Sequence, residues 1–201
     1  MSKKLLITGF DPFGGESVNP SWEAVKRLPD QIGSWQLIKM EIPTIYEKAA
    51  QTVLEKAKET MPDCVLAVGQ AGGRAGVTPE VIGINLREAK ISDNAGVKHA
   101  GEPIREDGPA AYFATVPVRK MVQNIQNASL PASLSYSAGA FVCNDVLYSL
   151  LDAFSGTNVK AGFIHVPFLP EQAPEGVKSL PLADIVKALI SAIEAMDEES
   201  R

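Results

Sequence analysis

Short apolar runs recur along this chain and alternate with stretches of helical periodicity. This alternation constrains the fold more than any other feature. The runs Leu5–Thr8, Cys64–Val68 and Val159–Val166 are mostly apolar, and each is followed by glycine or proline. Continuous apolar strands are typical of a parallel or mixed sheet that is covered on both faces. Their alternation with helices predicts an α/β fold.

The remaining segments fit the same pattern. Asn19 as a cap and Pro20 at the first helical position begin a helix that runs to about residue 28. Thr44, with Glu47 three residues later, predicts a capping box for a second helix. We expect further strands at residues 35–42 and 81–86, a short one at 134–136, a long functional loop at 87–114, and helices at 44–59, 117–127, 141–154 and 181–195. No repeat or linker interrupts them, so we expect one domain over residues 1–201.

Composition limits the class of protein. The chain has 201 residues and a formal net charge of -5, which argues against a large surface for nucleic acid or anionic membranes. Its 2 cysteines, Cys64 and Cys143, are too few for a disulfide framework. No export signal is recognisable at the N-terminus. We therefore expect a cytoplasmic protein whose thiols stay reduced.

Cys143 is the candidate nucleophile. It lies in the first turn of the predicted 141–154 helix. The positive end of a helix stabilises a thiolate, and the unpaired N–H groups there can bind an oxyanion. The alternative is a structural buried cysteine, which is a common fate of free thiols. Cys64 sits in an apolar strand and is expected to be a small buried hydrophobe.

His165 is the candidate base. It lies near the carboxyl end of the 159–166 strand, where open α/β sheets place their ligands. An imidazole there could accept the thiol proton and return it to a leaving amine. The alternative is a core histidine with satisfied hydrogen bonds. His99 lies in a polar loop and is expected to be exposed, and no metal site is expected.

A carboxylate that orients the imidazole would complete a triad. Glu80 directly precedes the predicted strand at 81–86 and is the best placed acid. By itself it could equally be a solvated loop residue. Asp93, Asp107 and Asp145 are rivals, although Asp145 is two residues beyond Cys143 and should point elsewhere on a helix.

Two glycine-containing turns follow predicted strands. The segment Gly69–Arg74 could bind a phosphate or an oxyanion, but it matches neither a P-loop nor a dinucleotide fingerprint. It leaves open a phosphate-handling enzyme such as a nucleoside phosphorylase. The segment Phe10–Gly15 carries two aromatic residues that could wall a small apolar pocket.

Taken together, these segments resemble the pyroglutamyl-peptidase I family, also called pyrrolidone carboxyl peptidases. The matching stretches follow the family's order over nearly the whole chain: Ile7–Gly15 with Asn19–Trp22, Gly69–Arg74, Thr78–Glu80 with Ile84 and Asn85, Asp93 and Asn94, Ser137–Asn144, and Gly162–Pro167 with Leu169 and Pro170.

The resemblance implies a three-layer α/β sandwich in which a mixed, twisted sheet lies between helices. It implies a thiol peptidase that removes N-terminal pyroglutamate (5-oxoproline) from peptides without a cofactor, and a homo-oligomer, either a dimer or a tetramer. By the family's pattern, Cys143 is the nucleophile, His165 the base and Glu80 the orienting acid. The lactam ring would bind among Phe10, Phe13, Gln70 and Val142.

Three positions depart from the family's pattern. Lys90 replaces an arginine near the oxyanion site; it keeps the charge but loses the planar fork. Asp145 replaces a histidine and would raise the thiol pKa if it faced the site. Val81 replaces another arginine. These departures leave a second hypothesis, in which a catalytically weakened homologue acts as a small-molecule binding module.

Overall fold

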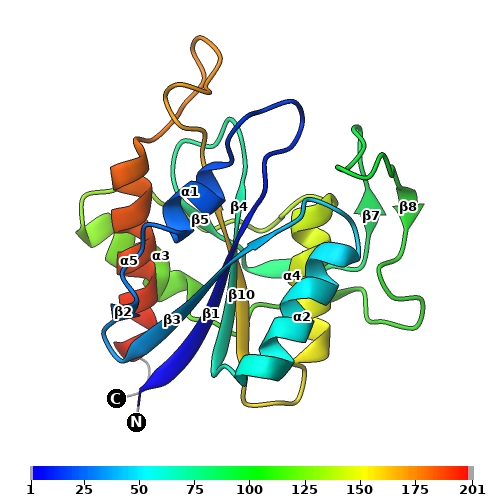
Figure 1. Cartoon of the computed structure of the whole chain (residues 1–201), viewed down its shortest axis with the longest axis horizontal. Coiled ribbons are helices and arrows are strands. Elements are labelled where there is room, and N and C mark those ends of the chain that lie inside the picture. Colours follow the sequence, from blue (N-terminus) through cyan, green and yellow to red (C-terminus); the bar gives the residue numbers. More distant parts are fainter. Residues whose placement is uncertain (1, 199–201) are drawn as a thin grey trace.

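The computed structural model describes residues 2–198. A six-stranded sheet lies at its centre, in the order β2-β3-β1-β4-β10-β5 (Figure 1). The four inner strands are parallel to one another, and the short edge strands β2 and β5 are antiparallel to their neighbours. The sheet is therefore mixed, as expected. In chain order, the strands are β1 (Lys3–Phe10), β2 (Gln31–Ile32), β3 (Trp35–Ile42), β4 (Cys64–Gln70), β5 (Thr78–Pro79) and β10 (Lys160–Val166).

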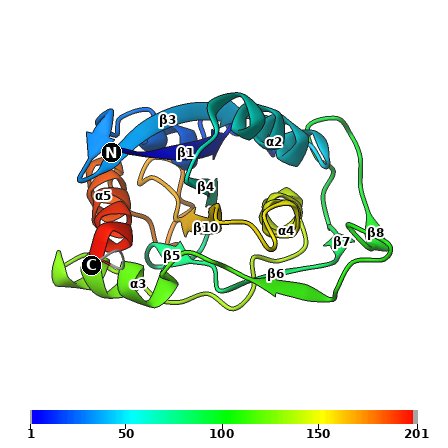
Figure 2. The same cartoon turned by 90° about the horizontal axis from the view of Figure 1, so that it is seen from below.

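Helices cover both faces of this sheet, which confirms the predicted three-layer sandwich. Figures 1 and 2 show α1 (Pro20–Val25), α3 (Val118–Asn127) and α5 (Leu182–Glu198) on one face. The other face is covered by α2 (Lys48–Thr60) and α4 (Val142–Ala153). Among the described residues, no helix combines the length and the apolar character that crossing a membrane requires.

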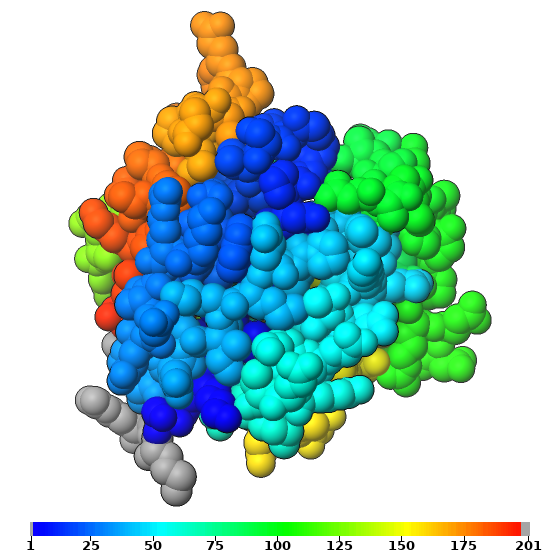
Figure 3. Space-filling view, viewed as in Figure 1, coloured from blue at the N-terminus to red at the C-terminus, as the bar shows by residue number. Residues whose placement is uncertain are grey.

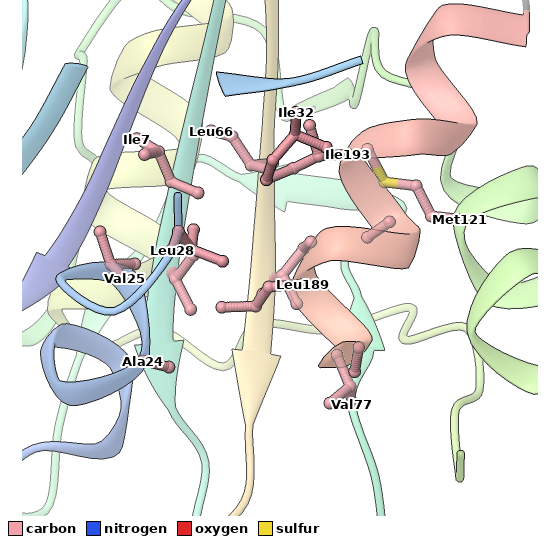
Figure 4. Close-up of a cluster of buried hydrophobic side chains, with 14 of the residues drawn as sticks. Ile7, Ala24, Val25, Leu28, Ile32, Leu66, Val77, Met121, Leu189 and Ile193 are labelled. Carbon is pink, nitrogen blue, oxygen red and sulfur yellow. The ribbon is translucent and has the colours of Figure 1, made fainter. Parts of the chain in front are cut away.

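The face under α1, α3 and α5 is packed with aliphatic side chains. Ile7 of β1 and Leu66 of β4 meet Leu189 and Ile193 of α5 in this layer (Figure 4), and all four are fully buried. Alternate strand residues point to opposite faces, so Leu6 belongs to the other cluster, under α2 and α4. Burial on both sides explains why the strands are continuous apolar runs.

Two small ribbons lie outside the main sheet. The residues expected as a strand at 81–86 form only β6 (Ile82–Ile84), which pairs with β9 (Ala111–Phe113). Within the segment expected to be a loop, β7 (Arg87–Glu88) pairs with β8 (Ala100–Glu102). The residues expected as a strand at 134–136 contribute an isolated bridge from Ser135 to Glu80. Pairing with distant segments, rather than hydrophobic periodicity, creates these elements.

The two predicted helix starts differ in outcome. Asn19 caps α1 as expected, accepting a hydrogen bond from the Ser21 N–H at 3.1 Å, although this helix ends at Val25. The capping box predicted for α2 was wrong. The helix begins at Lys48, and its N-terminal neighbour Glu47 makes no capping hydrogen bond. Both residues instead bind groups from distant parts of the chain: the Thr44 N–H donates to Asp11, and the Glu47 side chain binds Arg87.

Candidate active site

A cavity of about 350 Å³ opens at the carboxyl ends of the central strands. Figure 3 shows this end at the top, where the loop after β1 (blue) lies beside the segment after β10 (orange); Gln172 donates to the Val18 carbonyl between them at 2.9 Å. The cavity contains the predicted pair Cys143 and His165. The residues that line it come from five segments: Phe10, Phe13 and Asn19; Thr44; Gln70, Ala71 and Arg74; Ser137–Gly139, Phe141 and Cys143; and His165.

The Cys143 thiol lies against β4 at Gly69. Cys143 is the second residue of α4 and is partly exposed. A Cβ atom at position 69 would lie only 2.9 Å from the Cys143 Sγ, so only glycine leaves room for the sulfur. Gly69 is also the register neighbour of His165 on β10, and paired strands run about 4.8 Å apart. The fold thus brings the thiol and the imidazole together, from positions 22 residues apart in sequence.

Glu80 binds the other side of His165. Its Oε1 lies 2.6 Å from the His165 Nδ1, and both side chains are buried. β5 runs antiparallel to β10, and the Glu80 N–H donates to the Phe163 carbonyl at 2.9 Å. This pairing puts Glu80 opposite Phe163 and therefore diagonal to His165 on the same face. The pairing of β5 with β10 thus places the Glu80 carboxylate next to the His165 imidazole.

The Glu80–His165 pair is an anion next to a neutral imidazole. Burial alone would raise the pKa of Glu80, but its hydrogen bond with His165 and the guanidinium of Arg74 hold that pKa below its usual range. Burial lowers the pKa of His165, against the opposing effect of Glu80. Since the carboxylate can only accept, Nδ1 carries the proton. The lone pair of Nε2 remains available as a base.

Arg74 is a site residue to which sequence reasoning gave no role. Its Nη1 lies 2.7 Å from the Glu80 Oε1 and also donates to Thr78, and its Nη2 donates to the Ser137 carbonyl at 3.1 Å. It therefore neutralises the buried carboxylate and ties it to the cavity wall. A cation at the end of a glycine-rich turn, six residues before a candidate catalytic acid, was the available signal.

The thiol differs from its expected state. We expected the start of a helix to lower the Cys143 pKa, but burial, followed by the charge of Glu80, raises that pKa to about 12. The resting thiol is therefore protonated. The helix start has a different use: Phe141 supplies no side-chain cap, so first-turn N–H groups of α4 are available to a ligand.

Asp145 turns away from the thiol, towards the ribbon and α2. It is fully buried, accepts from the Arg87 Nε at 2.7 Å and from the Glu47 N–H at 2.9 Å, and thereby anchors the first turn of α4. Its neighbour Asn144 is also buried; it accepts from the Ile84 N–H and donates to the Ile84 and Leu86 carbonyls. The departure at Asp145 thus belongs to the scaffold behind the nucleophile.

Aromatic side chains wall the end of the cavity away from Glu80. Phe10 is buried there, and the rings of Phe13 and Phe141 lie 6.1 Å apart. The Oε1 of Gln70 is buried without a hydrogen-bond partner, a costly state unless a ligand supplies the donor. Val142 is the exception among the expected pocket residues, because it is fully buried in the core and does not line the cavity.

The other candidates lie elsewhere. Lys90 is exposed and is not part of the cavity lining. Of the rival acids, Asp107 is exposed and Asp93 is buried but accepts from the Tyr46 N–H instead of contacting His165. The expectation that His99 is exposed was wrong: its side chain is 20% exposed and packs edge-on against Tyr46, with ring centroids 4.6 Å apart.

Comparison with known proteins agrees with this geometry. The family described as pyroglutamyl peptidase matches residues 3–199. The pyrrolidone-carboxylate peptidase of Lactobacillus johnsonii is 49% identical over 97% of this chain and 93% of its own length. The pyrrolidone-carboxylate peptidase of Levilactobacillus brevis is 50% identical over 96% of this chain and 97% of its own length. The crystal structure of pyroglutamyl peptidase I from Bacillus amyloliquefaciens superimposes with a TM-score of 0.94 at 46% identity, covering 98% of this chain and 95% of the other. With a family match over nearly its whole length, the chain belongs to the pyroglutamyl peptidase family.

Proposed function

We propose that this protein is a cysteine peptidase that removes N-terminal pyroglutamate from peptides, with Cys143, His165 and Glu80 as its catalytic triad. The observation that carries the proposal is the 2.6 Å pair of Glu80 and His165 beside the Cys143 thiol, in one cavity with aromatic walls. Family membership supports the activity and gives no support to a binding module without catalysis or to a phosphate-handling enzyme.

The protonation states define the first step. The thiol and the imidazole are both neutral at rest, because burial raises the Cys143 pKa and lowers that of His165. As the sulfur attacks the pyroglutamyl carbonyl, Nε2 of His165 takes the thiol proton. Glu80 holds Nδ1–H and stabilises the imidazolium that forms. First-turn N–H groups of α4 stabilise the oxyanion.

The second half of the reaction returns the proton. The tetrahedral intermediate collapses, the C–N bond breaks, and His165 protonates the leaving amine of the shortened peptide. A thioester of pyroglutamate remains on Cys143. Water, deprotonated by the same imidazole, hydrolyses this thioester and releases free pyroglutamate and the thiol. No cofactor takes part in these steps.

The cavity suits a neutral lactam ring. Phe10, Phe13 and Phe141 provide flat apolar walls, and the unpaired Oε1 of Gln70 can accept the lactam N–H. Among the described residues that line the cavity, none is a carboxylate. A free amino terminus would therefore lose its hydration without gaining a counter-ion, which disfavours ordinary peptides.

A fluorogenic amide tests the proposal. Pyroglutamyl aminomethylcoumarin should be hydrolysed, whereas prolyl and glutaminyl aminomethylcoumarin should not, and iodoacetamide should abolish turnover. Mass spectrometry of an acid-quenched reaction should show a pyroglutamyl adduct on the peptide that contains Cys143. Turnover that survives complete alkylation of Cys143 would exclude it as the nucleophile.

We further propose that residues 1–201 form one domain and that the protein acts in the cytoplasm as a homo-oligomer, either a dimer or a tetramer. Met61 and Ile91 are exposed apolar side chains that a subunit interface would bury. Sedimentation equilibrium measures the assembly directly: a single species of 21.5 kDa at micromolar concentration would contradict it.

A further inference from the structure

A second hollow lies next to the cavity, beyond Arg74. It is a groove of about 710 Å³ lined by residues 74–76, by Thr78 and by residues 131–137. These two segments lie side by side, since the Val77 N–H donates to the Pro131 carbonyl at 2.9 Å. Arg74 and Ser137 line both the groove and the cavity, and the Arg74 Nη2 donates to the Ser137 carbonyl at 3.1 Å. The groove and the cavity therefore meet at this pair of residues.

The order of the strands gives a bound substrate its direction. Phe10 ends β1, Gly69 lies on β4 under the thiol, His165 lies on β10 and Glu80 follows β5, and these four strands are neighbours in that order. If the ring binds near Phe10 and the scissile carbonyl at the thiol, the leaving amine lies at His165, which must protonate it. The peptide that follows this amine then points towards β5 and the groove.

We propose that this groove binds the substrate residues that follow pyroglutamate, and that Tyr136 is the side chain on which they pack. The inference rests on the proposed function. Tyr136 lines the groove and is 62% exposed. An aromatic ring held at the edge of a groove offers a large contact area at low entropic cost, and every peptide can use it.

The rest of the groove suits an extended peptide of varied sequence. A Cβ atom at Gly76 would lie 2.3 Å from the Pro131 carbonyl oxygen. The main chains of the two segments are therefore in direct contact at this point of the groove. Within the described residues, the main-chain N–H and C=O groups of Leu134 and Tyr136 have no hydrogen-bond partner. Such groups can pair with a peptide backbone whatever its side chains. Arg74 is the one charged residue of the described lining.

Peptide length tests the inference. The kcat/KM for release of pyroglutamate should be about tenfold higher for pyroglutamyl-Ala-Ala-Ala-amide than for pyroglutamyl-Ala-amide, because binding remote from the reacting bond contributes to the reaction rate. The variant Tyr136→Ala should lose most of this advantage, mainly through KM for the longer peptide, and should leave the shorter one within about twofold of wild type.

Phe113→Ala is the matched control. Phe113 is 71% exposed on β9 and lines neither the cavity nor the groove, so this variant should keep the full length dependence. Equal kcat/KM for the two peptides in the wild type would overturn this inference but not the proposed function. A Tyr136→Ala variant with an unchanged ratio of the two kcat/KM values would do the same. Failure to hydrolyse either peptide would remove the proposed function and this inference with it.

Discussion

The two faces of the sheet carry one cysteine each, and they treat it differently. Cys64 of β4 lies under α5, fully buried among aliphatic side chains, with its sulfur 3.9 Å from that of Met196. Cys143 lies on the face of α2 and α4, beside His165 and near Glu80. Burial raises the pKa of both thiols to about 12. Neither thiol is activated by itself, so the neighbours decide which one is chemically useful.

Removing each thiol in turn should give the largest contrast between the faces. Cys143→Ala should lower kcat by at least about 10⁴-fold, the order expected when a covalent nucleophile is lost. Cys64→Ala should keep kcat within about twofold and lower only the melting temperature, since it opens a small space in a packed core. Initial rates with pyroglutamyl aminomethylcoumarin and thermal unfolding measure the two effects. An inactive but folded Cys64→Ala variant would contradict this comparison, because it would show that activity also needs Cys64.

Glu80→Gln tests whether charge, rather than shape, defines the active face. The amide can no longer stabilise an imidazolium, and we expect kcat to fall by about 10²- to 10⁴-fold. Glu80 also raises the His165 pKa, so the acid limb of the kcat/KM profile should move to lower pH.

The matched change on the exposed part of α2, Glu59→Gln, should alter neither kcat nor the profile. A profile that stays in place in Glu80→Gln would show that this carboxylate does not act through His165.

The buried charge of Asp145 and the buried side chain of Leu189 should both stabilise the fold, but only Asp145 should also affect the active site. Asp145→Asn leaves Arg87 buried with a weakened partner and should cost about 3–5 kcal/mol of unfolding free energy. Leu189→Ala on the other face should cost about 2–5 kcal/mol through a cavity. At a temperature where both variants are folded, Asp145→Asn should also lower kcat, because Asp145 anchors the first turn of α4. A kcat of Asp145→Asn equal to that of the wild type would show that the anchoring of α4 by Asp145 does not contribute to catalysis.

Alkylation rates should sharpen the comparison of the thiols. With Cys64 replaced by alanine, the iodoacetamide rate reports Cys143 alone. A thiol whose pKa is raised to about 12 is mostly protonated throughout the working range. Its alkylation should accelerate about tenfold per pH unit between pH 7 and 10. A plateau below pH 8 would indicate the low-pKa thiolate that the helix start suggested.

Lys90 should give the smallest effect. It is exposed and lies outside the lining of the cavity. Lys90→Ala should change kcat/KM by no more than about twofold and unfolding free energy by about 0.5 kcal/mol or less. A loss of tenfold or more would place its charge at the oxyanion when substrate is bound.

The sequence predicted the aliphatic face of the fold better than the active face. β1, β4 and β10 follow from apolar runs, and Met121, Val122 and Ile125 mark the buried side of α3. The residues around the site are arranged by long-range pairing, which leaves no periodic trace: Glu80 reaches His165 across 85 residues, and Arg87 reaches Asp145 across 58. Such contacts explain why the start of α2 and the state of the thiol could not be predicted.

The short edge strand that places Glu80 has a consequence for how activity is lost. β5 has two residues, and Glu80 is held by its own hydrogen bond to Phe163 and by bonds between its neighbours and Ser135. Protein edges open locally at a lower free energy than the core unfolds. Each such opening withdraws the carboxylate from His165 while the other strands stay paired. An opening of β5 that left the core folded would therefore break the proposed triad without unfolding the protein, and substitutions that stabilise only the core would not prevent it.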